Sequence, residues 1–371
     1  MEFKANKASF IEQLKKVGSI IPTSSINPLF ENISIECIGK SINLCGYSEV
    51  VCIKTNISEG IDIIKSGRCL VNAKIFIGII DKLSAKEFSA EVIDKTVLKL
   101  FSGKFTSNIN LYCDENTLDV SFEPSGKATT IPYSFFKLLN DKLLKLITTN
   151  KLLDNSPFRG VLLDSSRVED TLESTTTDQV DLAYIRTKHK GEKFKIILEP
   201  DIIKVLSSHN KKNEDLTVYL DNNKILVLLD GASYKCSLIE GQYPSAMRAL
   251  EAIYEFNFEI NKSDMVGAIE KVIVMNDDID GADATLKIDN TQLSISSSDI
   301  EKGSSNETIS IKGNIKDSIQ ITINANELLT LIKNISTKNI LFSFSTATKP
   351  IILKEEKNTD YISMILPIRR N

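Results

Sequence analysis

One pattern recurs along this chain: a short apolar strand that leads directly into an amphipathic helix. It occurs six times in the 371 residues. The helices are predicted over residues 7–20, 73–83, 133–148, 200–208, 262–275 and 325–335. Their starts recur roughly every 60–66 residues, and regular self-similarity of this kind indicates that one structural unit has been duplicated. The fold must therefore pack six similar strand–helix units together.

The predicted helix starts share the same local signals. Asparagine stands at four of them, where its side-chain oxygen can accept the first free amide protons of the helix: Asn6, Asn72, Asn261 and Asn324. Two other starts carry a proline, whose missing N–H costs nothing at that position. The agreement between spacing and capping residues supports six real helices.

The segments between the helices alternate apolar and polar residues, as strands with one buried face do. Turn signals separate them, at Gly39-Lys40, Asn222-Asn223, Asp230-Gly231 and Asp289-Asn290. Each unit is then one helix with about three or four antiparallel strands, which is too small for a good core. Two units per domain solve this, so we expect an α+β chain of three similar domains, at 1–120, 121–250 and 251–371.

Six similar helices on one side of a continuous sheet would form an arc. A second copy would close that arc into a ring lined by helices. The chain carries 45 basic and 49 acidic residues, so it is not the basic protein expected of a broad grip on DNA phosphates. A ring with a weakly positive pore and no base-reading surface would suit an object that slides along DNA.

Composition argues against most enzyme classes. The two histidines, His189 and His209, lie in Lys-rich stretches that we expect to be exposed loops, which weakens any Ser-His-Asp or Cys-His site. The six cysteines form no Cys-x-x-Cys pair and are expected to be mostly buried thiols in a reducing compartment. Gly39-Lys40-Ser41 lacks the first glycine of a phosphate-binding loop. No metal and no cofactor are expected.

One acidic segment resembles the start of a calcium loop, at residues 276–281. Its twelfth position, where a bidentate Glu is needed, is Lys287, so a solvated turn is the better interpretation. No apolar run approaches the roughly 20 residues of a membrane helix, and the N-terminus has no signal-peptide core. We therefore expect a cytoplasmic protein without membrane contact.

Three short segments resemble those of a known family, the bacterial replicative sliding clamps (the β subunit of DNA polymerase III). Residues 176–183 read Thr-Thr-Asp-Gln-Val-Asp-Leu-Ala and are similar to the family's Ala-Thr-Asp-Gly-His-Arg-Leu-Ala. Residues 238–244 read Leu-Ile-Glu-Gly-Gln-Tyr-Pro, and residues 364–369 read Met-Ile-Leu-Pro-Ile-Arg, each close to the family's segment at that place. The resemblance covers the whole chain. It implies the DNA-clamp fold, with the three domains as half of a ring.

The resemblance also implies partners and sites. It implies a homodimeric ring around duplex DNA without sequence preference, opened by an ATP-driven clamp loader. A pocket would bind short peptides with Leu and Phe anchors from DNA polymerase and other partners. The implied pocket residues are Phe158, Thr177, Leu182, Pro244, Arg248, Met364, Ile365, Leu366, Pro367, Ile368 and Arg369. Without the resemblance, plain core packing would be the better interpretation of the apolar ones.

Two further sets follow from the ring hypothesis. The DNA-facing candidates are lysines on or beside the six helices: Lys15, Lys16, Lys74, Lys82, Lys142, Lys145, Lys204, Lys271 and Lys333. The candidates for the head-to-tail contact between copies are Ser107, Ile109, Val274 and Met275. Acidic residues share the helices, so attraction to DNA should be weak and dependent on salt.

The chain also departs from the family. Gln179-Val180-Asp181 replaces Gly-His-Arg, so an acidic residue stands in place of a basic one and partner preference should differ. Such divergence is consistent with a phage, plasmid or reduced-genome member. Two other function classes stay open at this point. One is a β-rich protein-interaction module that does not touch DNA. The other is an enzyme with a metal held by Asp277, Asp278, Asp280 and Asp283.

Overall fold

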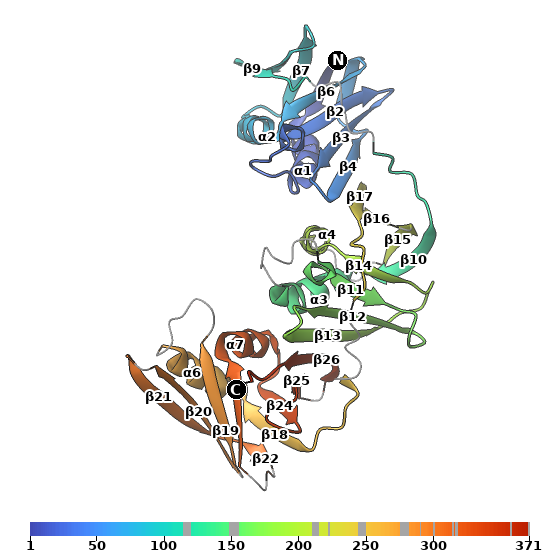
Figure 1. Cartoon of the computed structure of the whole chain (residues 1–371). Helices are drawn as coiled ribbons and strands as arrows, with labels where there is room; N and C mark the ends of the chain where they lie inside the picture. Colours follow the sequence, from blue (N-terminus) through green and yellow to red (C-terminus); the bar gives the residue numbers. More distant parts are fainter. Residues whose placement is uncertain are drawn as a thin grey trace. The chain divides into compact units, whose positions relative to one another are not determined.

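Figure 1 shows the computed structural model of the chain. The residues it describes are 1–113, 120–147, 156–209, 215–221, 223–243, 250–274, 282–289, 291–299, 301–313, 315, 318–356 and 358–369. They group into two compact units. Unit 1 comprises residues 1–136 and 201–238, and unit 2 comprises residues 137–200 and 239–371.

Each of the six predicted strand–helix units contains a helix close to the expected range. These helices are α1 Lys7–Gly18, α2 Ala73–Lys82, α3 Tyr133–Lys142, α4 Pro200–Ser207, α6 Lys262–Ile273 and α7 Ala325–Asn334. The asparagine caps are confirmed: Asn6 accepts from the amide of Ala8 at 2.9 Å, and Asn72 accepts from Ile75 at 3.1 Å. Asn261 and Asn324 cap α6 and α7 in the same way. Only α3 is much shorter than expected, because a separate 3-10 turn follows it at Leu144–Leu146.

Unit 1 contains two antiparallel sheets. The smaller has the strand order β5-β1-β7-β8-β9, and the larger has the order β10-β15-β16-β17-β4-β3-β2-β6. Their bounds are β1 Glu2–Asn6, β2 Asn32–Ile38, β3 Ser41–Tyr47, β4 Val51–Ile57, β5 Ile61–Lys65, β6 Gly67–Asn72, β7 Glu87–Ile93, β8 Val97–Ser102, β9 Phe105–Asn110, β10 Lys127–Pro132, β15 Asp215–Asp221, β16 Lys224–Leu229 and β17 Ala232–Ser237.

Unit 2 repeats this plan with a large and a small sheet. The large sheet has the order β14-β11-β12-β13-β26-β25-β24-β18-β22, and the small one has the order β21-β20-β19-β23. Their bounds are β11 Val161–Asp164, β12 Thr171–Thr177, β13 Asp181–Lys188, β14 Lys195–Leu198, β18 Phe256–Asn261, β19 Asp283–Ile288, β20 Gln292–Asp299, β21 Gly303–Ser310, β22 Lys312–Gly313, β23 Ile319–Asn324, β24 Asn339–Phe344, β25 Ile351–Glu355 and β26 Asn358–Ile365.

The sheets cross the predicted domain boundaries. Strand β17 pairs with β4, and β13 pairs with β26, so segments far apart in sequence share one hydrogen-bonded sheet. The continuous sheets expected from the repeat are present within each unit. The division into three domains stays a prediction.

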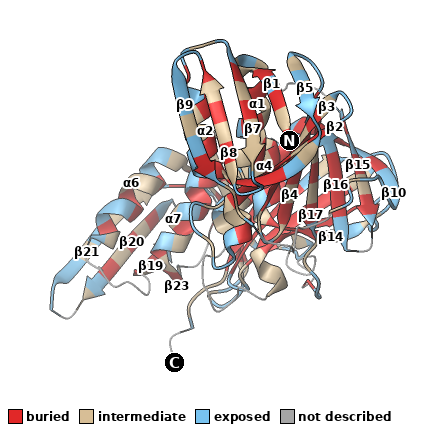
Figure 2. Cartoon of the chain, turned by 90° about the horizontal axis from the view of Figure 1, so that it is seen from above, coloured by how far each residue is buried: buried red, intermediate tan, exposed pale blue. Residues whose placement is uncertain are grey.

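The core of each unit lies between its sheets and helices, with buried and exposed residues alternating along the strands (Figure 2). In unit 1, Phe10 on α1 stacks edge-on against Phe76 of α2 and Phe88 of β7. In unit 2, Phe258 and Phe342 stack face to face across the β18–β24 pair, with ring centroids 4.9 Å apart. The Phe10 contacts join α1 to α2 and to β7, and the Phe258–Phe342 pair joins two neighbouring strands of the large sheet.

The expectation of two exposed histidines is wrong. His189 is buried, at 6% exposure, and packs edge-on against Phe194, because the loop that carries it folds back on the sheet. His209 is half-buried and forms a 2.7 Å hydrogen bond with the Tyr234 hydroxyl. Both are held by structural contacts. Gly39-Lys40 is the turn between β2 and β3, and Cys113 is an exposed thiol rather than a buried one.

Candidate functional site

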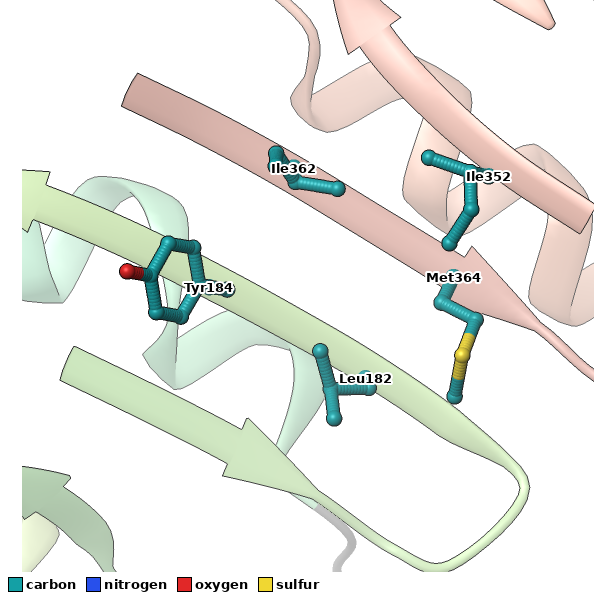
Figure 3. Close-up of a cluster of buried hydrophobic side chains, with 5 residues drawn as sticks. All are labelled: Leu182, Tyr184, Ile352, Ile362 and Met364. Atoms are coloured by element: carbon teal, nitrogen blue, oxygen red, sulfur yellow. The ribbon is translucent and has the colours of Figure 1, made fainter. Parts of the chain in front are cut away.

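The centre of the candidate site is the pairing of β13 with β26 in unit 2. Leu182 and Met364, both predicted pocket residues, lie directly opposite each other in this pairing. With Tyr184, Ile352 and Ile362 they form an apolar cluster on one face of the sheet (Figure 3). Leu250 and Tyr254 pack against it. The structure thus brings two segments of the resemblance, residues 176–183 and 364–369, into one apolar surface.

The tip of the β12–β13 hairpin is fixed by its own polar groups. The Thr177 hydroxyl donates to the carbonyl of Asp181 at 2.5 Å and accepts from the amide of Gln179 at 3.0 Å. Asp178 Oδ1 accepts from the amides of Val180 and Asp181, at 2.9 and 2.7 Å. Thr177 is therefore a residue that shapes the turn. The tip presents Val180, which is 40% exposed.

Gln179 has a backbone φ of +84°, in the left-handed region that favours glycine. The family pattern has glycine at this place. The substitution is thus tolerated with the turn geometry kept, at a conformational cost of about 1–2 kcal/mol. The hydrogen bonds from Thr177 and Asp178 hold the turn in place.

The C-terminal segment continues from β26 past this tip. The amide of Leu366 donates to the carbonyl of Val180 at 3.2 Å, and the amide of Ile368 donates to the carbonyl of Thr322 at 2.8 Å. Ile365 is fully buried, Leu366, Pro367 and Ile368 are half-buried, and Arg369 is exposed. Leu366 and Pro367 thus offer partly open apolar surface beside the Leu182–Met364 pair.

Tyr243 is a residue of this site that the sequence prediction missed. Its hydroxyl accepts from the amide of Thr177 at 3.0 Å and donates to the carbonyl of Gly160 at 3.3 Å. Its ring packs edge-on against Phe158, with centroids 5.8 Å apart. Tyr243 thereby links the predicted residues Phe158 and Thr177. It lies inside the segment 238–244, so the motif itself contained the signal.

An ion pair with a buried carboxylate supports the far end of the apolar cluster. Arg167 donates to the Glu173 carboxylate through Nε at 2.7 Å and Nη2 at 3.2 Å. The Tyr184 hydroxyl donates to the same carboxylate at 2.5 Å. Burial raises the pKa of Tyr184 to about 12, while the hydrogen bonds to Arg167 and Tyr184 keep the pKa of Glu173 below its usual value despite burial. These bonds orient the ring that forms part of the cluster.

Asp181 differs from Thr177 and Asp178, whose side chains hold the turn. Its side chain is buried, at 6% exposure, and its Oδ1 atom has no hydrogen-bond partner among the described residues. Burial, together with the neighbouring carboxylates of Glu327 and Asp178, raises the pKa of Asp181 to about 8. Burial likewise raises the pKa of Glu327, with Asp178 contributing. The family's basic residue is thus replaced by a carboxyl group that favours its neutral form.

Two predicted pocket residues, Pro244 and Arg248, lie outside the described residues, as does Met275 of the predicted contact between copies. The other three residues of that set are placed. Ser107 is half-buried on β9, Ile109 is buried in the core of unit 1, and Val274 at the end of α6 is 71% exposed.

Unit 1 also has a cavity of about 1020 Å³ next to β9. Ile75, Ile79 and Phe105 supply apolar wall, and Lys74, Lys82 and Lys104 also line it. Ile75 and Phe105 are unusually exposed for large apolar residues, at 51% and 44%. The sequence did not predict their exposure, because Ile75 lies in a predicted helix and Phe105 in a strand, where apolar residues are expected to be buried.

Most of the predicted DNA-facing lysines are surface residues. Lys74, Lys82 and Lys145 are exposed. Five others pair with a carboxylate: Lys15 with Asp81 at 2.5 Å, Lys16 with Asp230 at 3.0 Å, Lys204 with Asp201 at 3.1 Å, Lys271 with Glu307 at 2.9 Å and Lys333 with Glu270 at 2.7 Å. The Lys16 side chain is only 13% exposed, whereas the other four lysines are on the surface. Surface pairs of this kind contribute about 0–1 kcal/mol each, so they leave the cations available.

Lys142 differs from the rest because its acidic partner is also buried. Its side chain is only 12% exposed, and its ammonium lies 2.6 Å from the buried carboxylate of Glu355 and above the ring of Tyr361. It also donates to the carbonyl of Asn334 at 2.7 Å. These contacts give Lys142 a structural role within unit 2.

Metal sites and membrane-spanning helices bear on other functions, and both concern the described residues. No group of three or more His, Cys, Asp or Glu side chains in that part of the chain could hold a metal ion. The acidic stretch at 276–281 lies outside it. None of the helices that the structure describes has the length and apolar character to cross a membrane.

Comparison with known proteins gives one consistent family. The model of the DNA polymerase III beta subunit, N-terminal domain, matches residues 1–117, and that of its C-terminal domain matches residues 250–369. The "Beta sliding clamp" of Staphylococcus epidermidis is 25% identical, with 100% of this chain and 99% of the relative aligned. That of Mycoplasma genitalium is 24% identical, with 100% of each chain aligned.

Solved structures show the same fold. The DNA polymerase sliding clamp from Bacillus subtilis has a TM-score of 0.90 at 19% identity, over 100% of each chain. The beta subunit of Streptococcus pyogenes DNA polymerase has a TM-score of 0.89 at 20% identity, again over 100% of each chain. A DnaN sliding clamp from Pseudomonas aeruginosa bound to griselimycin has a TM-score of 0.87 at 17% identity, with complete coverage of both chains.

Proposed function

Because this chain belongs to the DNA polymerase III beta subunit family, the bacterial sliding clamps, we propose that it is a non-enzymatic processivity factor of DNA replication. It encircles duplex DNA as a closed homodimeric ring. DNA polymerase and the ATP-driven clamp loader bind it through a short peptide in the pocket near the C-terminus. A cytoplasmic location and three clamp domains, at 1–120, 121–250 and 251–371, belong to the same proposal.

The observation that carries the peptide pocket is the apolar surface built by Leu182, Met364 and Leu366. These residues come from two segments that are remote in sequence and adjacent in the sheet. Apolar surface with a few fixed polar groups beside it is how extended peptide anchors are bound. The half-buried Leu366 and Pro367 would cover an apolar anchor, and the hairpin tip at Val180 would border it.

Tethering explains how such a pocket helps replication. A polymerase that releases the primer end stays attached to the ring, so its effective concentration at the template remains high. The gain requires no catalytic group on the clamp. An external loader must open the ring, because the sequence contains no phosphate-binding loop of its own.

Ring closure would join unit 1 of one copy to unit 2 of the other. Strand β9 ends the small sheet of unit 1 and β21 ends the small sheet of unit 2, so each presents backbone groups that a further strand could pair. The exposed Val274 at the end of α6 would enter the cavity bordered by Ile75 and Phe105. Each copy would give one such contact and receive one, which closes a twofold ring.

Charge supports the same arrangement. The charged residues that line the cavity are Lys74, Lys82 and Lys104, with Glu31. Residues 251–371, which contain α6 and β21, carry 13 basic and 18 acidic residues. The net negative charge of this third of the chain would favour its approach to the net positive cavity.

DNA contact is proposed for the other eight lysines as a group: Lys15, Lys16, Lys74, Lys82, Lys145, Lys204, Lys271 and Lys333. Lys142 is left out because Glu355 already holds it. Since most of these lysines also face a carboxylate, the attraction to phosphates should be weak and fall steeply with salt. Weak attraction lets a ring slide.

The test of this function replaces Leu366 and Pro367 with Ser together. The double variant should still form a dimer, because neither residue belongs to the proposed contact between copies. It should lose stimulation of a DNA polymerase from the same host on a long primed template loaded with clamp. Stimulation at the native level would show the pocket assignment to be wrong. If the native protein stays a monomer and forms no ring even at high concentration, the alternative function, a protein-interaction module that does not touch DNA, is favoured instead.

A further inference from the structure

We propose that Asp181, Asp178 and Glu327 form an acidic recess at the edge of the peptide pocket that binds a basic side chain, Arg or Lys, of the partner peptide. The inference rests on the proposed function, since it names the class of peptide that the pocket selects. We call these three residues the acidic recess.

The first argument is the position of Asp181. It begins β13, next to Leu182, and pairs with Ile365 of β26. Because side chains alternate along a strand, Leu182 points to the apolar cluster and Asp181 points to the other face of the sheet. Helix α7 packs against β26, and its first turn carries Glu327. The recess therefore lies behind the pocket wall, at the hairpin tip.

The second argument is an unsatisfied group. Asp181 Oδ1 is buried without a hydrogen-bond partner in the described part of the chain. Native proteins pair almost all such atoms, because leaving one unpaired costs about 1–3 kcal/mol. An unpaired acceptor of this kind, at the start of a strand that forms the proposed binding surface, points to a donor that arrives with a ligand.

The third argument is charge. The other two members of the recess are also carboxylates, and both are only partly exposed. No ion pair joins any of the three to a basic side chain among the residues that the structure places. Arg369, at the end of the described chain, is exposed and has no such pair with them either. A metal ion is disfavoured, since the described residues contain no group of three potential ligands arranged to hold one.

The fourth argument is reach. The C-terminal segment touches both sides of the recess: Leu366 bonds to Val180 at the hairpin tip, and Ile368 bonds to Thr322, close before α7. A peptide with its apolar anchors on Leu182, Met364 and Leu366 would pass the tip. A long Arg or Lys side chain flanking the anchors could then extend to Asp178 and Glu327 and bring its charge to Asp181.

Proton release provides a specific signature. Asp181 faces Asp178 on the hairpin and Glu327 on α7, and its pKa is raised to about 8 by burial and these neighbours. It is therefore mostly neutral at pH 7 in the free protein. A guanidinium or ammonium group nearby favours the ionised carboxylate, so binding should expel a proton. A residue with only a structural role would not couple its protonation to the charge of the peptide.

The test uses the full-length dimer and pairs of synthetic peptides. Each peptide contains Leu and Phe anchors, with Arg or Gln at one flanking position in turn. Affinity is measured by fluorescence anisotropy, and proton release by calorimetry in buffers with different ionisation enthalpies. The native protein should bind at least one Arg peptide about 10–100-fold more tightly than its Gln partner, as expected for a charged hydrogen bond in a partly buried site. That binding should release protons.

The isosteric variant Asp181→Asn should remove both the Arg preference and the proton release, and Glu327→Gln should reduce the preference. The control Asp264→Asn removes an exposed carboxylate of α6 and should keep both. If native protein binds every Arg and Gln pair equally, the recess proposal is wrong while the pocket stands. If no peptide binds, the pocket and the proposed function fail together with the recess.

Discussion

Leu182 and Met364 face each other across two antiparallel strands, although nearly half the chain separates them in sequence. Neither residue is polar or catalytic. Their pairing joins the β12–β13 hairpin to the C-terminal strand, so that the turn at Asp178–Val180 and the segment Leu366–Ile368 become neighbours. A substitution that weakens the pairing of these strands should therefore alter the shape of the proposed pocket, even if the substituted residue does not contact a bound peptide.

The turn itself provides a first test. Gln179→Gly should increase the free energy of unfolding by up to about 1 kcal/mol, because the left-handed backbone at φ +84° no longer strains a side chain. The gain is partly offset by the greater freedom of glycine in the unfolded chain. Chemical denaturation measures the change. Val180→Gly is the matched control at a residue without positive φ, and it should lower the free energy of unfolding. Equal effects of the two substitutions would contradict the inference that the backbone at Gln179 is strained.

The second prediction concerns pH. The pKa of Asp181 is raised to about 8 in the folded chain, against about 3.9 in an unfolded one. Below pH 4 the carboxyl is protonated in both states and contributes no pH dependence. Between about pH 4 and 8 only the unfolded state is ionised, so stability should fall as pH rises, by at most about 1.4 kcal/mol per pH unit. Above pH 8 this contribution is constant.

The Asp181→Asn variant should remove that slope. Its free energy of unfolding relative to that of the native protein should therefore be higher at pH 8 than at pH 5. Denaturation midpoints across this pH range give the answer. A native profile that is flat from pH 5 to 8, and unchanged in the variant, would mean that Asp181 is ionised in the folded state.

Ring closure supplies a third prediction. Val274→Asp places a charge on a residue that is 71% exposed in a single copy and would be buried in the dimer. The free energy of unfolding of the monomer should change little, whereas the dimer dissociation constant should rise by about 100-fold or more, since an unpaired charge would be buried. Sedimentation at several concentrations measures this. Ile253→Asp is the control, because Ile253 is 94% exposed and does not line the cavity of the proposed contact. If both variants form dimers as strongly as the native protein, Val274 is not part of the contact between copies.

A fourth prediction separates the lysines. Lys142→Ala should lower the free energy of unfolding by about 3 kcal/mol, because it leaves the buried carboxylate of Glu355 without its partner. Lys204→Ala should have almost no effect on stability, because its pair with Asp201 is exposed. Thermal denaturation compares the two. If Lys142→Ala is as stable as Lys204→Ala, the interior role of Lys142 is refuted.

The sequence predicted the helices well because their signals are local. The spacing of Phe10, Leu14 and Val17 and the cap at Asn6 depend only on neighbouring residues, and α1 begins where expected. The resemblance likewise pointed to Leu182 and Met364. No local signal could show that they are partners, because strand pairing between remote segments depends on the whole sheet.

The remaining differences are tertiary in origin. His189 lies in a polar, Lys-rich loop, and only the packing of that loop against Phe194 buries it. Tyr243 is one residue of a motif in the sequence, and only the fold places its hydroxyl between Thr177 and Gly160. The environment of Asp181 needed α7, which lies far along the chain, because the neighbouring charge of Glu327 is invisible from residues 176–183.

The edge strands β9 and β21 affect how a newly made copy behaves before a dimer forms. An uncovered strand edge is a template for any extended chain, including another newly made copy in the wrong register. In the proposed ring these two edges would cover each other, so a single copy would carry an aggregation hazard that the closed dimer would lack. Dilution, slow synthesis or a damaged contact at Val274 would expose the hazard again, so solubility in the cell should depend on keeping the dimer closed.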